Sequence, residues 1–375
     1  MKKSLLGIVA GALCAGAAWG GVPAELETEA RAAMAKGAAW LAAQQQAGGH
    51  WALADSPALT GLAMWALQKT DPAAHKSAID RAMVFLLTSV QEDGSIWRQP
   101  SVERKGGGLA NYNTAVCMTA LHALGRPELV PVIQNARAYL AKMQYLDGGA
   151  YGGGMGYDAD QGRPYTDLSN SYMAYEAMRL TQDVEDLRAA GEPKADLDWA
   201  AAQAFLAQVQ NLPGVNTNSY ASESADDRGG FAYTPGAGPA TTNAEGKVTL
   251  RSYGSMTYAG LLALIYAQVD AQDARVQSAK DWASRHWTLD ENPGMGAEGL
   301  YYFFNVLTKS LAAAGDETLA RPDGRTIAWR EEVVRKLLAL QRPDGSWFND
   351  NNRWWEADPN LVTAYTLLAL ATALE

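Results

Sequence analysis

The chain has 375 residues, of which 48% are hydrophobic, and its formal net charge is −10 at pH 7. This length is enough to bury a large core in one or two domains, and the acidic balance excludes a basic nucleic-acid-binding surface. Twelve Trp and sixteen Tyr stand against only six Phe. Tyr and Trp suit positions with an apolar body and a polar tip, such as pocket walls.

The first twenty residues predict a secretory signal peptide. Lys2 and Lys3 precede a short apolar run from Leu5 to Ala18, and small residues around Gly20 suit a cleavage site. The run is too short for a comfortable membrane span. We therefore expect an exported protein, periplasmic or secreted, with no stable membrane span after cleavage.

The two cysteines limit the covalent chemistry. Cys14 lies inside the signal run, but Leu13 before it is bulkier than the small residue that a lipoprotein signal prefers, and lipidation stays open. After cleavage only Cys117 would remain, so the mature chain is expected to have no internal disulfide.

Helical patterns then alternate in pairs along the chain, which predicts six helix pairs. The first helix of each pair carries more charged and amide side chains and is expected outside. The second is apolar nearly all round and is expected to be buried. The expected pairs are residues 26–45 with 57–68, 81–90 with 113–124, 133–143 with 168–180, 199–209 with 254–266, 276–286 with 299–314, and 329–340 with 360–374.

A turn of recurring sequence joins the two helices of a pair. Its best copy runs from Gln341 to Trp347 and the next best from Gln91 to Trp97. Pro-Asp-Gly is turn chemistry, and the Trp offers a flat face for packing. We interpret the turn as a fastener between outer and inner helix. Its marker glutamines are expected at positions 46, 91, 144, 210 and 341, and aligned hydroxyls follow on the inner helices at Thr60, Thr114, Ser171, Thr257 and Thr363.

Alternating outer and inner helices form either an open solenoid or a closed ring. The terminal pairs lack the polar outer face of solenoid caps, and the inner helices are too apolar to line an open surface. We therefore predict an all-α fold, an α/α toroid of six helix-pair repeats, as one domain over residues 24–375. Loop insertions at about 145–166 and 211–251 should lie at one end of the ring, and loops this long are usually functional or disordered.

The helix pairs and their turns resemble the prenyltransferase and squalene-oxidase repeat family, which includes the squalene–hopene cyclases, from about Ala33 to the end of the chain. Residues 167–170, 252–258 and 354–358 are similar to an exported bacterial branch of this family that has no established activity. The resemblance implies a toroid that acts on, or binds, an elongated apolar, terpenoid-like molecule in its centre.

The chain departs from the family's chemical motifs. Class II terpene cyclases protonate their substrate with an Asp-x-Asp-Asp motif, and the nearest fragments here are Asp158-Ala159-Asp160 and Asp226-Asp227. Cys117 lacks the Asp and His partners of the zinc-binding relatives. No metal or cofactor is expected, although Ca²⁺ at the loop acids stays open.

Three acids are candidate catalytic residues. Asp167, at the head of the third inner helix, is either an N-cap or a general acid whose pKa an apolar cavity would raise. Asp358 precedes a helix start, where capping is the simpler interpretation. Glu356 follows two tryptophans and suits a carbohydrate or a cation, or a salt bridge to Arg353.

The candidate ligand-binding residues are polar or aromatic side chains at the heads of inner helices. Each also has a structural interpretation, as a helix-end partner or as part of the core. They are Asn113, Asn170, Ser252, Tyr253, Tyr258, Tyr301, Tyr302, Trp354 and Trp355.

Three functions follow from the sequence. The first is a terpene-cyclase-like enzyme or binder of an elongated apolar ligand. The second is a carbohydrate-active enzyme in which Asp167 and Glu356 form the acid pair. The third is a non-catalytic exported binding or scaffold protein. The expected partner is thus a small apolar molecule or a glycan, and the sequence leaves the oligomeric state open.

Overall fold

A computed structural model describes residues 21–101, 108–158, 165–243 and 245–375. The expected signal peptide with Cys14, and Asp160 of the candidate Ca²⁺ pair, lie outside these residues. The α-helices are α1 (Ala24–Ala43), α2 (Pro57–Thr70), α3 (Lys76–Leu87), α4 (Ala110–His122), α5 (Val130–Met143), α6 (Leu168–Leu180), α7 (Trp199–Val209), α8 (Gly254–Tyr266), α9 (Ala274–Arg285), α10 (Leu300–Ala314), α11 (Trp329–Ala339) and α12 (Pro359–Leu374).

Short elements occupy the connections. The 3₁₀ turns are η1 (Pro127–Leu129), η2 (Gly149–Tyr151), η3 (Gln182–Leu187) and η4 (Arg353–Trp355). Strands β1 (Ala240–Thr242) and β2 (Val248–Leu250) pair antiparallel, as do β3 (Leu319–Ala320) and β4 (Thr326–Ile327). The first hairpin lies within the expected 211–251 insertion. In the described part of the chain, no helix is long and apolar enough to cross a membrane.

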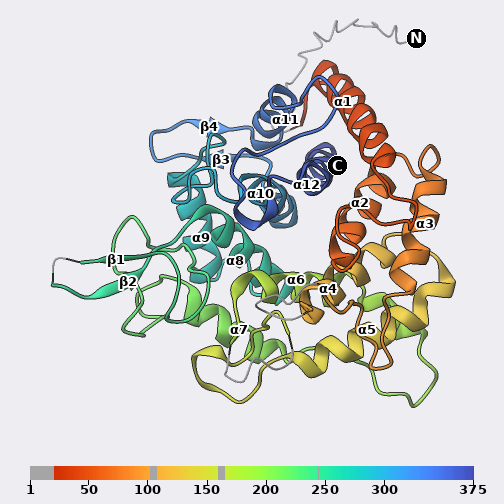
Figure 1. Cartoon of the computed structure of the whole chain (residues 1–375). Coiled ribbons are helices and arrows are strands. Elements are labelled where there is room, and N and C mark those ends of the chain that lie inside the picture. The colour runs from red at the N-terminus through yellow and green to blue at the C-terminus, as the bar shows by residue number, and fades with distance from the viewer. Residues whose placement is uncertain (1–20, 102–107, 159–164, 244) are drawn as a thin grey trace, which may run out of the picture.

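The even-numbered helices form a closed ring (Figure 1). Each of α2, α4, α6, α8 and α10 packs against the next even-numbered helix, and α12 packs against α2. The odd-numbered helices lie outside. Helices α3, α5 and α9 pack against the inner helix before them, and α1 packs against α12. This packing agrees with a toroid and disagrees with an open solenoid.

The aligned hydroxyls hold the turns that precede the inner helices. Each accepts a hydrogen bond from a turn N–H that would otherwise be buried without a partner. The bonds run from Trp51 N to Thr60 (3.2 Å), Ile96 N to Thr114 (2.8 Å), Met155 N to Ser171 (2.9 Å), Phe231 N to Thr257 (3.2 Å) and Trp347 N to Thr363 (3.1 Å).

The marker glutamines join neighbouring pairs, so the expectation of a fastener within one pair is incomplete. In four of the pairs a glutamine amide donates to a carbonyl of its own turn and to one at the next outer helix. The bonds across pairs run from Gln45 to Ala78 O, Gln144 to Asp198 O, Gln210 to Arg275 O and Gln341 to Ala33 O. The first marker is therefore Gln45, not Gln46. Gln46 and Gln91 each stand one residue after the marker position of their own turn, and they donate to Ala52 O and Trp97 O respectively.

The last turn closes the ring on the first helix. Gln341 donates to Ala33 O at 2.8 Å, and the Trp347 ring lies against Gly37 of α1. A Cβ atom at Gly37 would lie only 2.6 Å from that ring. The glycine therefore permits the close approach of α1 to the C-terminal turn.

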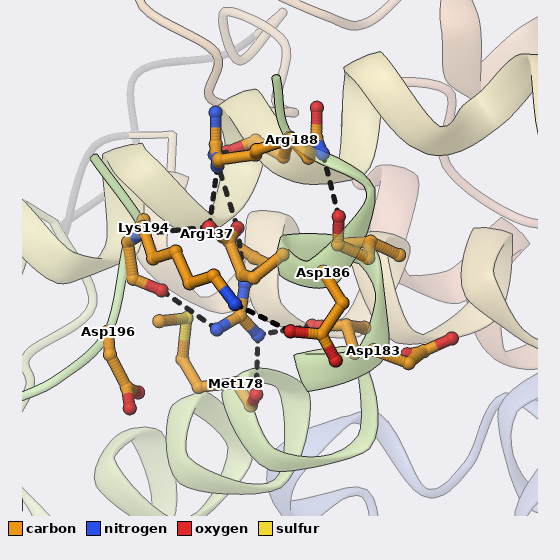
Figure 2. Close-up of polar contacts among 12 residues, drawn as sticks. Arg137, Met178, Asp183, Asp186, Arg188, Lys194 and Asp196 are labelled. Carbon is orange, nitrogen blue, oxygen red and sulfur yellow. Dashed lines mark hydrogen bonds and ion pairs between the residues drawn. The ribbon is translucent and has the colours of Figure 1, made fainter. Parts of the chain in front are cut away.

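A buried charge network fixes the segment after α6. Arg137 of α5 donates to Glu185 Oε1 at 2.9 Å, to Thr181 Oγ1 at 2.8 Å and to Ala195 O at 2.8 Å. Figure 2 shows Arg137 within this network, beside Arg188 and the outer pair of Lys194 with Asp186. Burial raises the pKa of Glu185, but hydrogen bonds from Arg188, the Ala195 amide and Arg137 outweigh it and leave this pKa below its usual value.

Arg137→Met should lower the free energy of unfolding by about 3 kcal/mol or more, because it breaks a buried ion pair with Glu185 and removes the donor to Thr181 Oγ1 and Ala195 O. Lys194→Met is the matched control, since the side chains of Lys194 and Asp186 are 61% and 76% exposed. It should leave the free energy of unfolding nearly unchanged. Urea titration of both variants measures the two losses, and similar small losses would contradict this role of Arg137.

Candidate functional site

A cavity of about 320 Å³ lies at the end of the ring where the inner helices begin. Its wall is mainly aromatic and aliphatic, with Trp354 and Trp355 beside it. The tyrosines of the wall are Tyr112, Tyr157, Tyr233, Tyr253, Tyr302 and Tyr365. The aliphatic side chains are Leu59, Leu109, Met173, Met256 and Leu361, and the polar ones are Ser56, Ser169, Ser255 and Glu356.

Helix geometry explains which inner-helix residues reach the cavity. Positions two before and two after an aligned hydroxyl lie about 40° apart around a helix, because each residue turns about 100°. They therefore share a face. Around Ser171 these positions are Ser169 and Met173, and around Thr363 they are Leu361 and Tyr365.

The first turns of the inner helices need hydrogen-bond acceptors, since their N–H groups have none within the helix. Side chains from later in the chain supply several of them. Ala58 N donates to Asn113, Ala110 N to Asp158, Ser255 N to Asn292 and Tyr302 N to Glu356. Helices α6 and α12 are capped by their own Asp167 and Asp358, each accepting at 2.8 Å.

Asp167 lies behind the cavity wall and is completely buried. Burial raises its pKa to about 6, although hydrogen bonds from both amides of Asn170 and from the hydroxyls of Tyr233 and Tyr165 act in the opposite direction. Asp167 Oδ2 accepts from Asn170 Nδ2 at 2.7 Å. Because Tyr233 also lines the cavity, its hydroxyl links this acid to the wall. A carboxyl group that keeps its proton up to about pH 6 suits general acid chemistry.

Glu356 lines the cavity, but its carboxylate is occupied by the start of α10. Oε1 accepts from Tyr302 N at 2.7 Å, and Oε2 accepts from Tyr301 N at 3.2 Å and Asn349 Nδ2 at 2.7 Å. Burial raises the pKa of Glu356, and these bonds oppose the shift. Arg353, the salt-bridge partner in one of the alternative interpretations of Glu356, lies over the Trp354 ring, 5.1 Å from its centre.

The structure brings Tyr253, Tyr302, Trp354, Trp355 and Glu356 together at the cavity. The other candidates lie outside its lining because each has a partner elsewhere. Asn113 and Asp358 cap helices, and Asn170 binds Asp167. Ser252 donates to Asp227 O, while Tyr258 and Tyr301 lie edge-on against Phe303 and Phe304.

The loop acids also have structural partners. Asp158 accepts from Ala110 N at 2.6 Å, and Asp227 accepts from Ser252 N at 2.8 Å and Ser222 Oγ at 2.6 Å. Among the described residues no group of three or more His, Cys, Asp or Glu side chains is placed to hold a metal ion.

Several wall residues were not predicted from the sequence. Tyr112 and Tyr365 stand two positions from the aligned Thr114 and Thr363, so the helix spacing carried a usable signal. Tyr157 and Tyr233 come from the two long loops. Irregular segments have no periodicity that would have pointed these side chains toward the ring axis.

No family model matches the chain, and no curated protein matches it. Among solved structures it is similar to the type II terpene cyclase MstE from Scytonema. The apo enzyme has a TM-score of 0.54 at 13% identity, covering 93% of this chain and 98% of that one. A variant of MstE in complex with geranylgeranyl dihydroxybenzoate has a TM-score of 0.54 at 13% identity, covering 93% and 99%.

A glycosidase variant in complex with glucose is also similar, with a TM-score of 0.52 at 15% identity, covering 94% of this chain and 99% of that one. The three similarities show that the chain shares the α/α-toroid fold of these proteins. Because proteins of one fold can have different activities at such low identity, any activity has to be inferred from the residues of the site.

The raised pKa of Asp167 predicts a pH dependence of stability. Between about pH 4 and 6 the folded protein keeps a proton that the unfolded chain releases, so the free energy of unfolding should fall as pH rises through this window. Asp167→Asn should make stability fall less steeply with rising pH than in wild type, while Glu356, whose pKa burial also raises, keeps its own contribution. Asp358→Asn, which alters the equivalent cap of α12, is the control and should keep the wild-type slope. Urea titrations across this pH range measure the slope, and an unchanged slope in Asp167→Asn would refute the assignment.

Proposed function

We propose that this protein binds an elongated, mainly apolar molecule in the central cavity of its toroid. The observation that carries the proposal is the composition of the wall, in which six tyrosines and five aliphatic side chains surround the ring axis. Its volume of about 320 Å³ is typical of a small-molecule site. Burial of apolar ligand surface would drive binding at roughly 25 cal/mol per Å².

The comparison with MstE supports this ligand class by analogy. A toroid of similar shape holds geranylgeranyl dihydroxybenzoate, which combines a long apolar chain with a polar aromatic group. Tyrosine faces also favour a cationic centre within about 6 Å of the ring. The wall of this cavity therefore suits both a neutral isoprenoid-like chain and positive charge that develops along it.

Proton transfer from Asp167 is the catalytic extension of this proposal. The acid has a raised pKa, and its Tyr233 partner reaches the cavity wall. In this mechanism the protonated carboxyl group gives its proton to the bound molecule, through or beside the Tyr233 hydroxyl. Asn170 and Tyr165 then stabilise the resulting carboxylate by hydrogen bonds.

Glycan cleavage is favoured less by the site. Such chemistry needs two carboxyl groups free to act across a cleft. Both oxygens of Glu356 accept hydrogen bonds from α10 or Asn349, which ties this acid to the fold. The exposed tryptophans suit a sugar face, but the rest of the wall is apolar.

Two further inferences complete the proposal. The N-terminal pattern of residues 1–20 supports export to the periplasm or beyond, where the cavity would meet its ligand. The recurring hydroxyl and glutamine contacts support descent of the six helix pairs from one repeat, with the fifth pair the most divergent.

Leu59→Trp should weaken ligand binding at least tenfold, because the indole would fill the cavity next to α2. The test incubates the mature protein with a bacterial lipid extract, identifies retained species by native mass spectrometry, and titrates farnesol by tryptophan fluorescence. Val84→Trp, at a position 56% exposed on α3, is the control and should bind like wild type. Circular dichroism checks folding. Equal affinity in Leu59→Trp, or retention of oligosaccharides alone, would count against the proposal.

If a retained lipid is converted, Asp167→Asn should abolish turnover while leaving binding within about threefold, because the amide keeps the cap but has no acidic proton. Wild-type turnover should also decline as pH rises above about 6, where Asp167 loses its proton. Single-turnover assays across this range provide the measurement. Full activity in Asp167→Asn would rule out this residue as the acid.

A further inference from the structure

A second, smaller space of about 20 Å³ lies deeper along the ring. Tyr112, Met173 and Tyr365 line both it and the large cavity, so the two spaces share a boundary. The side chains of Tyr112 and Tyr365 interact with each other at this boundary. A ligand that extends from the large cavity into the small space would part this contact.

An ion pair lines the small space. Lys309 Nζ of α10 donates to Glu176 Oε2 of α6 at 3.0 Å, and the side chains are only 11% and 7% exposed. The ammonium also lies over the Trp65 ring, 4.5 Å from its centre, and Tyr266 donates to Glu176 Oε1 at 3.2 Å. The charges of the pair cancel, so the site has no net attraction for an ion.

The same space contains a buried acceptor without a partner. Asn305 precedes Lys309 by one turn of α10, lines the space and is 2% exposed. Its Oδ1 atom has no hydrogen-bond partner among the described residues. A buried carbonyl oxygen left unpaired is costly, which identifies a place where a donor group would be bound.

We propose that this small space is a recognition subsite for a hydroxyl group at one end of the apolar ligand. A volume of about 20 Å³ holds one water-sized group. A hydroxyl group can donate to Asn305 Oδ1 and accept from the Lys309 ammonium at once, since the bond to Glu176 uses one of three ammonium protons. The inference rests on the proposed function and refines its ligand to a long-chain alcohol.

Other end groups match the subsite less well. A carboxylate would face Glu176, and an ammonium would face Lys309, so each meets a like charge. An ether or ketone oxygen can accept from Lys309 but leaves Asn305 Oδ1 unpaired. A phosphate is too large for one water-sized space.

The experiment titrates the mature protein with 1-dodecanol, dodecyl methyl ether, dodecanoate and dodecylamine, followed by tryptophan fluorescence and native mass spectrometry. Wild type should bind the alcohol about tenfold more tightly than the ether, because only the alcohol supplies a donor. The two charged probes should bind more weakly than the alcohol.

Asn305→Leu should bind alcohol and ether equally, since it removes the unpaired acceptor. Glu176→Leu with Lys309→Met removes both charges together without leaving one charge buried alone. It should weaken alcohol and ether alike, because both accept from Lys309, while the preference for the alcohol, which depends on Asn305, persists. Ser310→Ala is the matched control. It removes another buried, unpartnered oxygen of α10 from a residue that lines neither space, and the preference should persist.

The outcomes separate this inference from the proposed function. Binding of all four probes without an alcohol preference in wild type, or a preference that survives in Asn305→Leu, overturns the hydroxyl subsite alone. Tightest binding of dodecanoate or dodecylamine also overturns it. Binding of none of the probes overturns both the subsite and the apolar-ligand function.

Discussion

The inner helices all begin at one end of the ring, and the unpaired N–H groups of their first turns must find acceptors there. This requirement determines what most of the polar side chains at that end do. Asn113, Asp158 and Glu356 cap helices elsewhere in the ring, and Asp358 caps its own. Asp167 also caps its helix, yet its pKa is raised to about 6 and the side-chain hydroxyl of Tyr233, a cavity-wall residue, interacts with it. Asp167 therefore caps α6 and is also a candidate for the acid that protonates a ligand in the cavity.

Capping across pairs also holds the cavity wall in place. Because each cap comes from a later part of the chain than the helix it serves, and the glutamines join neighbouring outer helices, the pairs cannot move independently. The contact between Trp347 and Gly37 extends this coupling across the two ends of the chain. A wall held in place in this way is rigid, which suits a preformed site that selects its ligand by shape. The proposal of an elongated apolar ligand depends on this rigidity of the wall.

The fold was largely predictable because the inner helices are apolar on all faces and the turns recur in sequence. Thr60 and Thr363 align from the sequence alone, and in the structure each accepts a hydrogen bond from the backbone N–H of its own turn. The register of the glutamines was harder, since two adjacent glutamines, Gln45 and Gln46, fit the pattern and only the contacts separate them. The site was less predictable. Tyr233 reaches the cavity from an irregular loop, and only the tertiary structure shows that Glu356 is occupied by α10.

The central claim is that the ring axis accommodates an elongated apolar molecule with a hydroxyl end group. A crystal structure of the protein grown with 1-dodecanol tests it most directly. The account predicts continuous density from the tyrosine-lined cavity past Tyr112 and Tyr365, with the ligand oxygen within hydrogen-bond distance of Asn305 Oδ1 and Lys309 Nζ. An unchanged Tyr112–Tyr365 contact with no ligand along the axis, at a concentration that saturates binding in solution, would contradict it.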